Sequence, residues 1–135
     1  MDGLKLLQDK YPKIFQCASL LYIGADPVHW TEFLDIFKMG AWNTNAMVLE
    51  LNPEHVKKLQ ELKVNVIEGD VRNIETLFGR KKFETIIWED GPEHIPNSEY
   101  DNVIPQLINT ASKFVVMEAP DGKYGHPESG QELIL

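Results

Sequence analysis

Cysteine is almost missing from this chain, since Cys17 is the only one among 135 residues. A single cysteine excludes an internal disulfide and a cysteine-based metal site, and we interpret Cys17 as a buried or half-buried structural thiol. It also favours a reducing, cytoplasmic setting. Three of the four histidines, His29, His55 and His126, lack the His-x-x-x-His spacing of a metal-binding pair, so we predict no metal site.

Long apolar runs are absent as well. No stretch approaches the ~18 consecutive apolar residues that a membrane span requires. The amino terminus, Met-Asp-Gly-Leu-Lys, lacks the basic and then apolar layout of a secretory signal. We therefore expect no membrane association.

Positive charge is scarce, because 13 basic residues face 21 acidic ones and leave a net charge of -8. Affinity for nucleic acid comes largely from neutralising phosphates with Lys and Arg, so this balance disfavours DNA or RNA as the primary partner. The one basic cluster, residues 80–82, is more typical of a loop than of a nucleic-acid surface.

What the chain does have is a regular alternation of short apolar runs and helical patterns. This alternation predicts a single α/β domain over 1–135, with a leading helix over 1–18 that Pro12 interrupts and an irregular tail over 118–135. The expected fold is a doubly wound, mainly parallel, five-stranded Rossmann-like sheet with helices on both faces. The predicted strands are 20–23, 46–51, 64–67, 83–88 and 113–117, and the predicted helices follow Pro27, Asn52, residue 73 and Ser98.

An acidic residue lies at or just after the end of each predicted strand. In a parallel sheet these ends point the same way, so we expect the carboxylates to gather along the edge where open α/β sheets bind ligands. The residues concerned are Asp26, Glu50, Asp70, the pair Glu89 and Asp90, and Glu118.

Two of these acids suggest a nucleoside site. Glu50 lies 26 positions after Gly24 in the chain, where a carboxylate can accept hydrogen bonds from both ribose hydroxyls. Asp70 is placed to accept from an adenine amino group. Each has a structural alternative: Glu50 as a solvated strand end, and Asp70 as an Asx-turn or helix cap. The pattern alone admits NAD, FAD and S-adenosylmethionine equally.

Charge favours the last of these ligands. Dinucleotides carry a pyrophosphate, which needs glycine amides free of nearby anions, yet Asp26 stands where a second glycine would be. Two like charges ~4 Å apart repel by about 4 kcal/mol at an effective dielectric near 20. S-adenosylmethionine has an ammonium and a sulfonium and no phosphate, so Asp26, Glu89 or Asp90 would attract it. Asp26 is open to a second interpretation, as the negative charge of a helix amino terminus.

The series of motifs resembles the class I (Rossmann-like) S-adenosylmethionine-dependent methyltransferases, over roughly residues 20–125. The similar stretches are Leu-Leu-Tyr-Ile-Gly-Ala at 20–25, Val-Leu-Glu-Leu-Asn at 48–52, Val-Ile-Glu-Gly-Asp-Val at 66–71, Phe-Glu-Thr-Ile-Ile-Trp-Glu-Asp at 83–90 and Glu-His-Ile-Pro at 93–96. The resemblance implies S-adenosylmethionine as cofactor and a methyl acceptor that is a small molecule or a protein.

The resemblance also implies roles for individual residues. Gly24 and Ala25 would pass the methionine part of the cofactor, and Glu89 would lie near its amino group. Glu50 would bind ribose, and Asp70 with Val71 would bind adenine. We also assign to the cofactor site Asp26, Leu51 beside Glu50, and Tyr22, which stands where the family usually has an acid.

Methyl transfer needs a base only if the acceptor must lose a proton, and Asp90 and His94 are the candidates for that catalytic role. A structural or solvent-exposed His94 is the alternative. Asp26 and the lack of the family's carboxyl-terminal β-hairpin keep a second function open, a non-catalytic S-adenosylmethionine-binding or interaction protein. Gly-Ala-Asp-Pro-Val-His-Trp at 24–30 faintly resembles a turn of some RNA methyltransferases, a third and disfavoured reading. A short sheet leaves its last edge bare, which suggests a homodimer through that edge.

Overall fold

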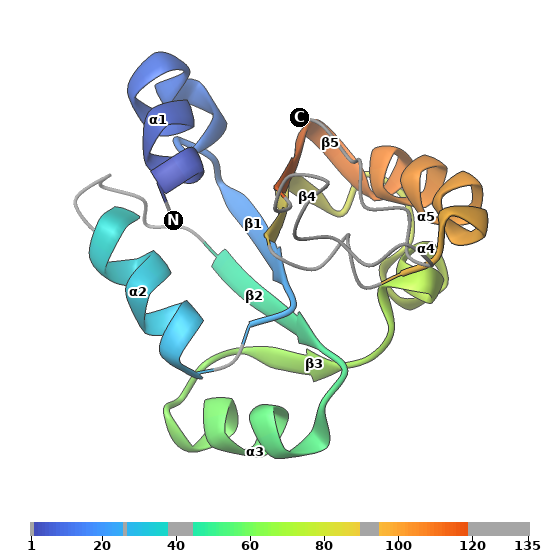
Figure 1. The fold of residues 1–135 in the computed structure, drawn as a ribbon, viewed down its shortest axis with the longest axis horizontal. Helices are drawn as coiled ribbons and strands as arrows, with labels where there is room; N and C mark the ends of the chain where they lie inside the picture. The colour runs from blue at the N-terminus through green and yellow to red at the C-terminus, as the bar shows by residue number, and fades with distance from the viewer. Residues whose placement is uncertain (1, 26, 38–44, 90–94, 119–135) are drawn as a thin grey trace.

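A computed structural model describes residues 2–25, 27–37, 45–89 and 95–118 of the chain. Five strands form one sheet in the order β3-β2-β1-β4-β5, and all four neighbouring pairs are parallel (Figure 1). This confirms the predicted doubly wound parallel sheet. The strands are β1 (Ser19–Ile23), β2 (Asn45–Glu50), β3 (Val66–Glu68), β4 (Phe83–Glu89) and β5 (Ala111–Glu118).

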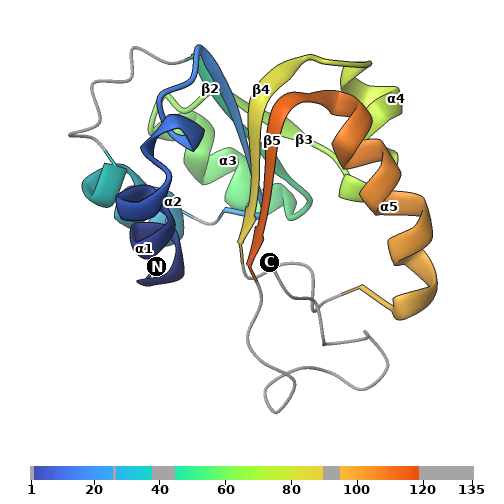
Figure 2. The same ribbon diagram turned by 90° about the horizontal axis from the view of Figure 1, so that it is seen from above.

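Helices cover both faces of the sheet, as predicted. Seen along the sheet in Figure 2, α1, α2 and α3 lie on one side, and α4 and α5 lie on the other. The predicted break at Pro12 separates α1 from a short 3-10 helix. The helices are α1 (Asp2–Lys10), α2 (Pro27–Phe37), α3 (Pro53–Glu61), α4 (Ile74–Phe78) and α5 (Asn97–Thr110), with 3-10 turns η1 (Pro12–Ile14) and η3 (Val71–Asn73).

The sheet is apolar on both faces, because both are covered. Along β1, Leu20 and Tyr22 belong to the apolar cluster under α2 and α3, whereas Leu21 and Ile23 belong to the cluster under α4 and α5. All four side chains are buried. The central strand therefore reads as a continuous apolar run, which is the sequence signal that predicted it.

Local signals set the helix ends beside the sheet. The Asn52 side chain accepts a hydrogen bond from the Glu54 backbone N–H at 2.9 Å, and Pro53 follows the cap, so α3 begins where the sequence predicted. Gly79 ends α4 with a φ of +86°, a conformation that favours glycine.

Several predicted boundaries were wrong, those of β1, β2 and β4 by a single residue at an end. The third strand begins at Val66 and not at Val64, because α3 ends in a turn in which Lys63 takes a φ of +65°. The last strand begins earlier, at Ala111, directly after α5. Ser98 is not the cap of α5, which begins at Asn97 after Pro96. Glu118, predicted to open the irregular tail, is the last residue of β5, and residues 119–135 lie outside the described part of the chain.

Cys17 is buried, and burial raises the pKa of its thiol above the ordinary value. This agrees with a structural thiol. Within the described residues, no helix has the length and apolar character needed to cross a lipid bilayer.

Candidate functional site at the carboxyl edge of the sheet

The predicted site residues that the structure describes lie along the carboxyl edge, the edge of the sheet at which its parallel strands end. Ile23 is in register with Leu49 of β2 on one side and with Trp88 of β4 on the other. One position further along, Glu50 and Glu89 therefore stand on either side of Gly24. Glu118 is in register with Glu89, so Glu50, Glu89 and Glu118 of the expected row lie at this edge. Glu68, which was not predicted, is in register with Glu50 and lies there too.

Gly24 lies where the connections from β1 and β4 diverge. The chain leaves β1 for β2 on one side and leaves β4 for β5 on the other, so Gly24 stands at the topological switch point of the sheet. Gly24 has a φ of +79°, and its N–H donates to the Leu49 carbonyl oxygen at 2.8 Å. Among the described residues, no atom beyond its two chain neighbours lies within 4 Å of the place where a Cβ would stand. Within that part of the chain, conformation and not crowding requires glycine here.

Glu50 is buried, with 7% of its surface exposed. Its Oε2 accepts a hydrogen bond from the Asn52 backbone N–H at 2.7 Å, and His55 Nδ1 lies 3.7 Å away. The solvated strand end that the sequence left open is therefore excluded. The turn after β2 holds this carboxylate at the edge of the sheet, one residue beyond the position that pairs with β1.

Asp70 lies close to Glu50 along the edge, because the Gly69 N–H donates to the Glu50 carbonyl oxygen at 3.0 Å. The turn is closely packed at Gly69, where a Cβ would stand 2.8 Å from Leu77 Cδ1 and would make that leucine shift. The tight turn after β3 thus brings the predicted ribose and adenine residues to neighbouring positions.

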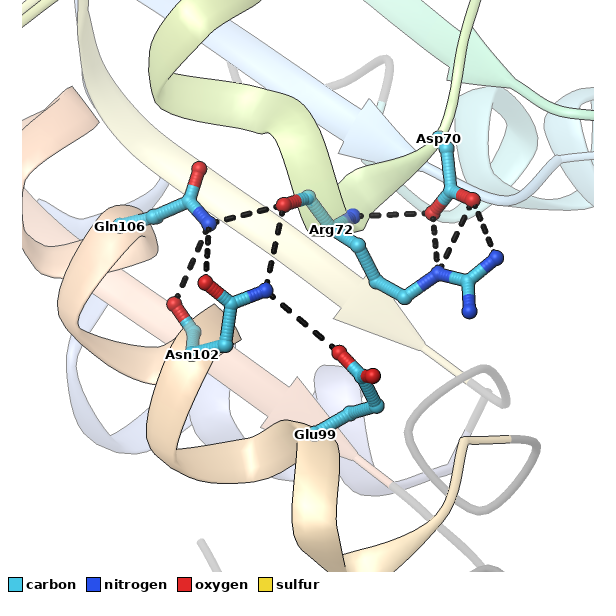
Figure 3. Close-up of polar contacts among 5 residues, drawn as sticks. All are labelled: Asp70, Arg72, Glu99, Asn102 and Gln106. Atoms are coloured by element: carbon cyan, nitrogen blue, oxygen red, sulfur yellow. Dashed lines mark hydrogen bonds and ion pairs between the residues drawn. The ribbon is translucent and has the colours of Figure 1, made fainter.

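The Asp70 carboxylate is engaged by Arg72 (Figure 3). It caps η3 by accepting from the Arg72 backbone N–H at 2.9 Å, and its Oδ2 accepts from Arg72 Nη2 at 2.6 Å. Arg72 Nε donates to both oxygens, at 3.1 and 3.0 Å. These hydrogen bonds lower the pKa of Asp70 below its ordinary value. The cap that the sequence offered as an alternative is present, and an adenine amino group would have to share or replace a bond to Arg72.

Glu89 is held from beneath by Tyr22. Tyr22 Oη donates to Glu89 Oε1 at 2.6 Å, and the two residues are 1% and 2% exposed. The Tyr22 ring packs against Trp30 and Phe33, with ring centroids 5.8 and 4.7 Å away. Tyr22 therefore lies under the carboxyl edge and orients a carboxylate at the switch point.

This contact was not predicted from the sequence, although the strand register contains a signal for it. Tyr22 is in register with Ile87, so Glu89 is its diagonal neighbour on the adjacent strand and on the same face. A predicted register between the first and fourth strands would have paired them.

The remaining predicted cofactor residues differ in exposure. Ala25 is fully buried and Val71 nearly so, whereas 61% of Leu51 is exposed beside Glu50. An exposed leucine at this edge is available to an apolar ring. Asp26, Asp90 and His94 lie outside the described residues, so their predicted roles stay predictions. Among the described residues, no three His, Cys, Asp or Glu side chains are grouped as a metal site would need.

Sequence comparison finds no relative, since neither a protein-family model nor a curated protein matches the chain. The structure does match solved ones. An S-adenosylmethionine-dependent methyltransferase from Archaeoglobus fulgidus superimposes with a TM-score of 0.68 at 20% identity, over 90% of this chain and 53% of the other. The chain has a class I, Rossmann-like methyltransferase fold.

Two further similar structures support this assignment. A protein from Pyrococcus horikoshii OT3 has a TM-score of 0.67 at 19% identity, over 86% of this chain and 54% of that one. The plantazolicin methyltransferase BamL, solved with S-adenosylhomocysteine, has a TM-score of 0.59 at 14% identity, over 82% and 39%. The chain thus spans about half the length of the first two proteins and less than half the length of the third.

Proposed function

We propose that this chain binds S-adenosylmethionine at the carboxyl edge and transfers its methyl group to a small molecule or a protein side chain. One observation carries the proposal. A buried carboxylate, Glu50, stands at the end of β2 beside Gly24, which opens the switch point of a sheet with methyltransferase topology. The structures it resembles include S-adenosylmethionine-dependent enzymes.

The residues present fit this cofactor. Glu50 would accept hydrogen bonds from the ribose hydroxyls, and the methionine part would lie beside Gly24. Leu51 would contact the adenine ring, and the Asp70–Val71 segment would read its edge. Glu89, oriented by Tyr22, would place negative charge near the ammonium group.

The same residues suit a dinucleotide less well. Glu50 and Glu89 flank Gly24 in the register of the sheet. An acid at the position of Glu50 also binds the ribose of dinucleotides, but a pyrophosphate seated at Gly24 would lie beside the Glu89 carboxylate as well. Like charges at close range repel by several kcal/mol at an effective dielectric near 20. The same negative charge attracts the ammonium and sulfonium groups of S-adenosylmethionine and repels a phosphate.

When bound, the cofactor supplies an electrophilic methyl group on a sulfonium. The protein then has to hold the acceptor in line with that methyl group and exclude water, and proximity of this kind lowers a barrier by several kcal/mol. Where the acceptor carries a proton that must leave, Asp90 or His94 after β4 would take it.

Calorimetry of binding tests the proposal. We expect S-adenosylmethionine and S-adenosylhomocysteine to bind and NAD not to bind. Glu50→Gln should weaken both adenosyl ligands by about 10- to 100-fold, because hydrogen bonds to a charged acceptor contribute about 1.5–3 kcal/mol. The matched control is Glu68→Gln, an exposed acid in register with Glu50. Equal effects of the two variants, or binding of NAD alone, would contradict the proposal.

Binding without transfer is the second candidate function, and Tyr22 favours it, because a phenol stands where these methyltransferases usually have an acid. A methyl-release assay over small-molecule, peptide and RNA acceptors separates the two. Release with any acceptor supports the enzyme. Tight adenosyl binding with no release across the panel supports the binder.

A further inference from the structure

Three amide side chains on α5 lie on one face of the helix. Asn102, Gln106 and Asn109 are spaced four and three residues apart, which places them one above another along a helix. This face is turned towards η3 and α4, the segment that follows β3 and begins at Asp70 (Figure 3). The amides thus meet the part of the chain that carries one end of the candidate site.

Both the Nε2 and the Oε1 atom of the Gln106 amide form hydrogen bonds with this segment. Its Nε2 donates to the Arg72 carbonyl oxygen at 2.8 Å, and its Oε1 accepts from the Glu75 backbone N–H at 3.0 Å. The first group belongs to η3 and the second to the first turn of α4, where an N–H has no partner within its own helix. One side chain therefore joins the end of η3 to the start of α4.

The two neighbouring amides extend the contact. Asn102 Nδ2 lies 3.4 Å from the Arg72 carbonyl oxygen, and Asn102 Oδ1 accepts from Gln106 Nε2 at 3.1 Å. Asn109 Nδ2 donates to Glu75 Oε1 at 3.1 Å. Asn102 thereby holds the Gln106 amide in the orientation that reaches Arg72.

Apolar packing sets the distance between the two segments, and the amides set their register. Val71 in η3 and Ile74 in α4 belong to the same buried cluster as Val103 and Leu107 of α5. Such contacts are not directional, whereas hydrogen bonds are. The Gly69–Glu50 hydrogen bond holds the Asp70–Val71 turn on its β3 side, and the Gln106 hydrogen bonds hold the η3 and α4 side.

We propose that Gln106, with Asn102 behind it, is a positioning residue that fixes the Asp70–Val71 turn so that it can discriminate the base of the ligand. This inference rests on the proposed function, in which that turn reads the adenine edge. Gln106 touches no ligand itself; it acts through the Arg72 carbonyl group and the Glu75 N–H group.

The test compares Gln106→Leu with Gln60→Leu, the same substitution at an exposed glutamine on α3. The ligands are S-adenosylhomocysteine and its inosine analogue, in which a carbonyl oxygen replaces the adenine amino group. We expect the wild type and Gln60→Leu to prefer the adenine ligand. Gln106→Leu should lower that preference about fivefold or more, while the affinity for the inosine analogue changes little.

A second measurement needs no ligand. The Arg72 N–H bonds the Asp70 carboxylate, so its hydrogen exchange reports whether the turn is held. We expect Gln106→Leu to speed this exchange by about tenfold, and Gln60→Leu to leave it unchanged. Asn102→Ala should give the same changes with smaller size, and it replaces Gln106→Leu if that variant does not fold.

The outcomes separate the two proposals. Faster Arg72 exchange in a protein that binds neither ligand shows that Gln106 holds the turn, but it contradicts the proposed function and with it the role in base discrimination. Adenosyl binding with unchanged base preference in Gln106→Leu overturns the positioning role and leaves the proposed function standing. So does a wild type that binds the adenine and inosine ligands equally.

Discussion

The two halves of the carboxyl edge hold their acids in different ways. In the inner half, made of Gly24 and the Tyr22–Glu89 pair, a phenol from β1 donates to a carboxylate 67 positions away, and both are buried. In the outer half, Asp70 is bonded by Arg72, only two positions along the chain, and the Arg72 side chain is 46% exposed.

Because of this difference, the two halves contribute differently to the stability of the fold and to ligand binding. The inner contact exists only when β1 and β4 are paired, so it contributes to the stability of the sheet as well as to the site. The outer contact forms within one turn and is screened by water, so it contributes little to stability. We infer that the inner half is the fixed part of the site and that the outer half is where a ligand is discriminated.

The largest expected effect is at Tyr22. Tyr22→Phe removes the hydrogen bond to the buried Glu89 carboxylate and keeps the ring packing, so we expect a loss of about 2 kcal/mol in the free energy of unfolding. For a domain of this size that lowers Tm by several degrees. Thermal unfolding of Tyr22→Phe beside Tyr11→Phe, an exposed tyrosine, checks it. A Tm equal to that of the wild type would show that the inner pair contributes no stability.

The next largest effect is at Gly24, where comparison with Gly79 distinguishes a loss of stability from a loss of ligand binding. Gly24→Ala and Gly79→Ala each place a side chain at a positive φ with no atom of a described residue beyond the chain neighbours within 4 Å, so each should cost about 1 kcal/mol in the free energy of unfolding. Only Gly24 lies at the carboxyl edge, so only Gly24→Ala should weaken S-adenosylhomocysteine, by more than tenfold. If calorimetry gives the two alanine variants the same affinity for S-adenosylhomocysteine, Gly24 does not lie at the ligand site.

The smallest effect is at Arg72, and its sign depends on pH. Because the pKa of Asp70 is lowered in the folded protein, the pair stabilises the fold above the ordinary Asp pKa of about 3.9, and this contribution is lost as pH falls through the lowered value. Arg72→Ala should therefore be less stable than the wild type at pH 6, by less than about 1 kcal/mol, and equally stable at the acid end.

Thermal unfolding between pH 2 and pH 6 measures this difference. Arg80→Ala, which removes a guanidinium 4.0 Å from Glu75, is the matched control and should leave the titration of the Asp70 carboxyl unchanged. If the difference in stability between the wild type and Arg72→Ala grows as the pH falls, the predicted pH dependence of the Asp70–Arg72 pair is contradicted. Arg72→Ala should also strengthen adenosyl binding a few-fold, because it frees the Asp70 oxygens.

Much of the fold could be predicted because its signals are local. Buried strands read as apolar runs, Asn52 with Pro53 marks a helix start, and parallel pairing then brings Glu50 and Asp70 to one edge. The boundary of β3 was wrong because the left-handed Lys63 has no side-chain signature.

What the sequence could not show are contacts that need a register between distant segments. Glu50 was predicted as a ribose ligand, but its burial depends on how the turn to Asn52 folds back. The Tyr22–Glu89 pair needs the register of β1 and β4, and the bonds from Gln106 need the placement of α5 against α4. Apolar periodicity carries no information on which polar side chains will meet.

The central claim is that one adenosyl ligand lies across both halves of the carboxyl edge. Titration of the isotope-labelled protein with S-adenosylhomocysteine, followed by backbone amide NMR, tests it most directly. The account predicts the largest shifts at Gly24, Leu51, Asp70 and Glu89, with little change at the opposite edge around Ser19 and Phe83. Shifts confined to one half, centred on the opposite edge, or absent at saturating ligand would contradict it.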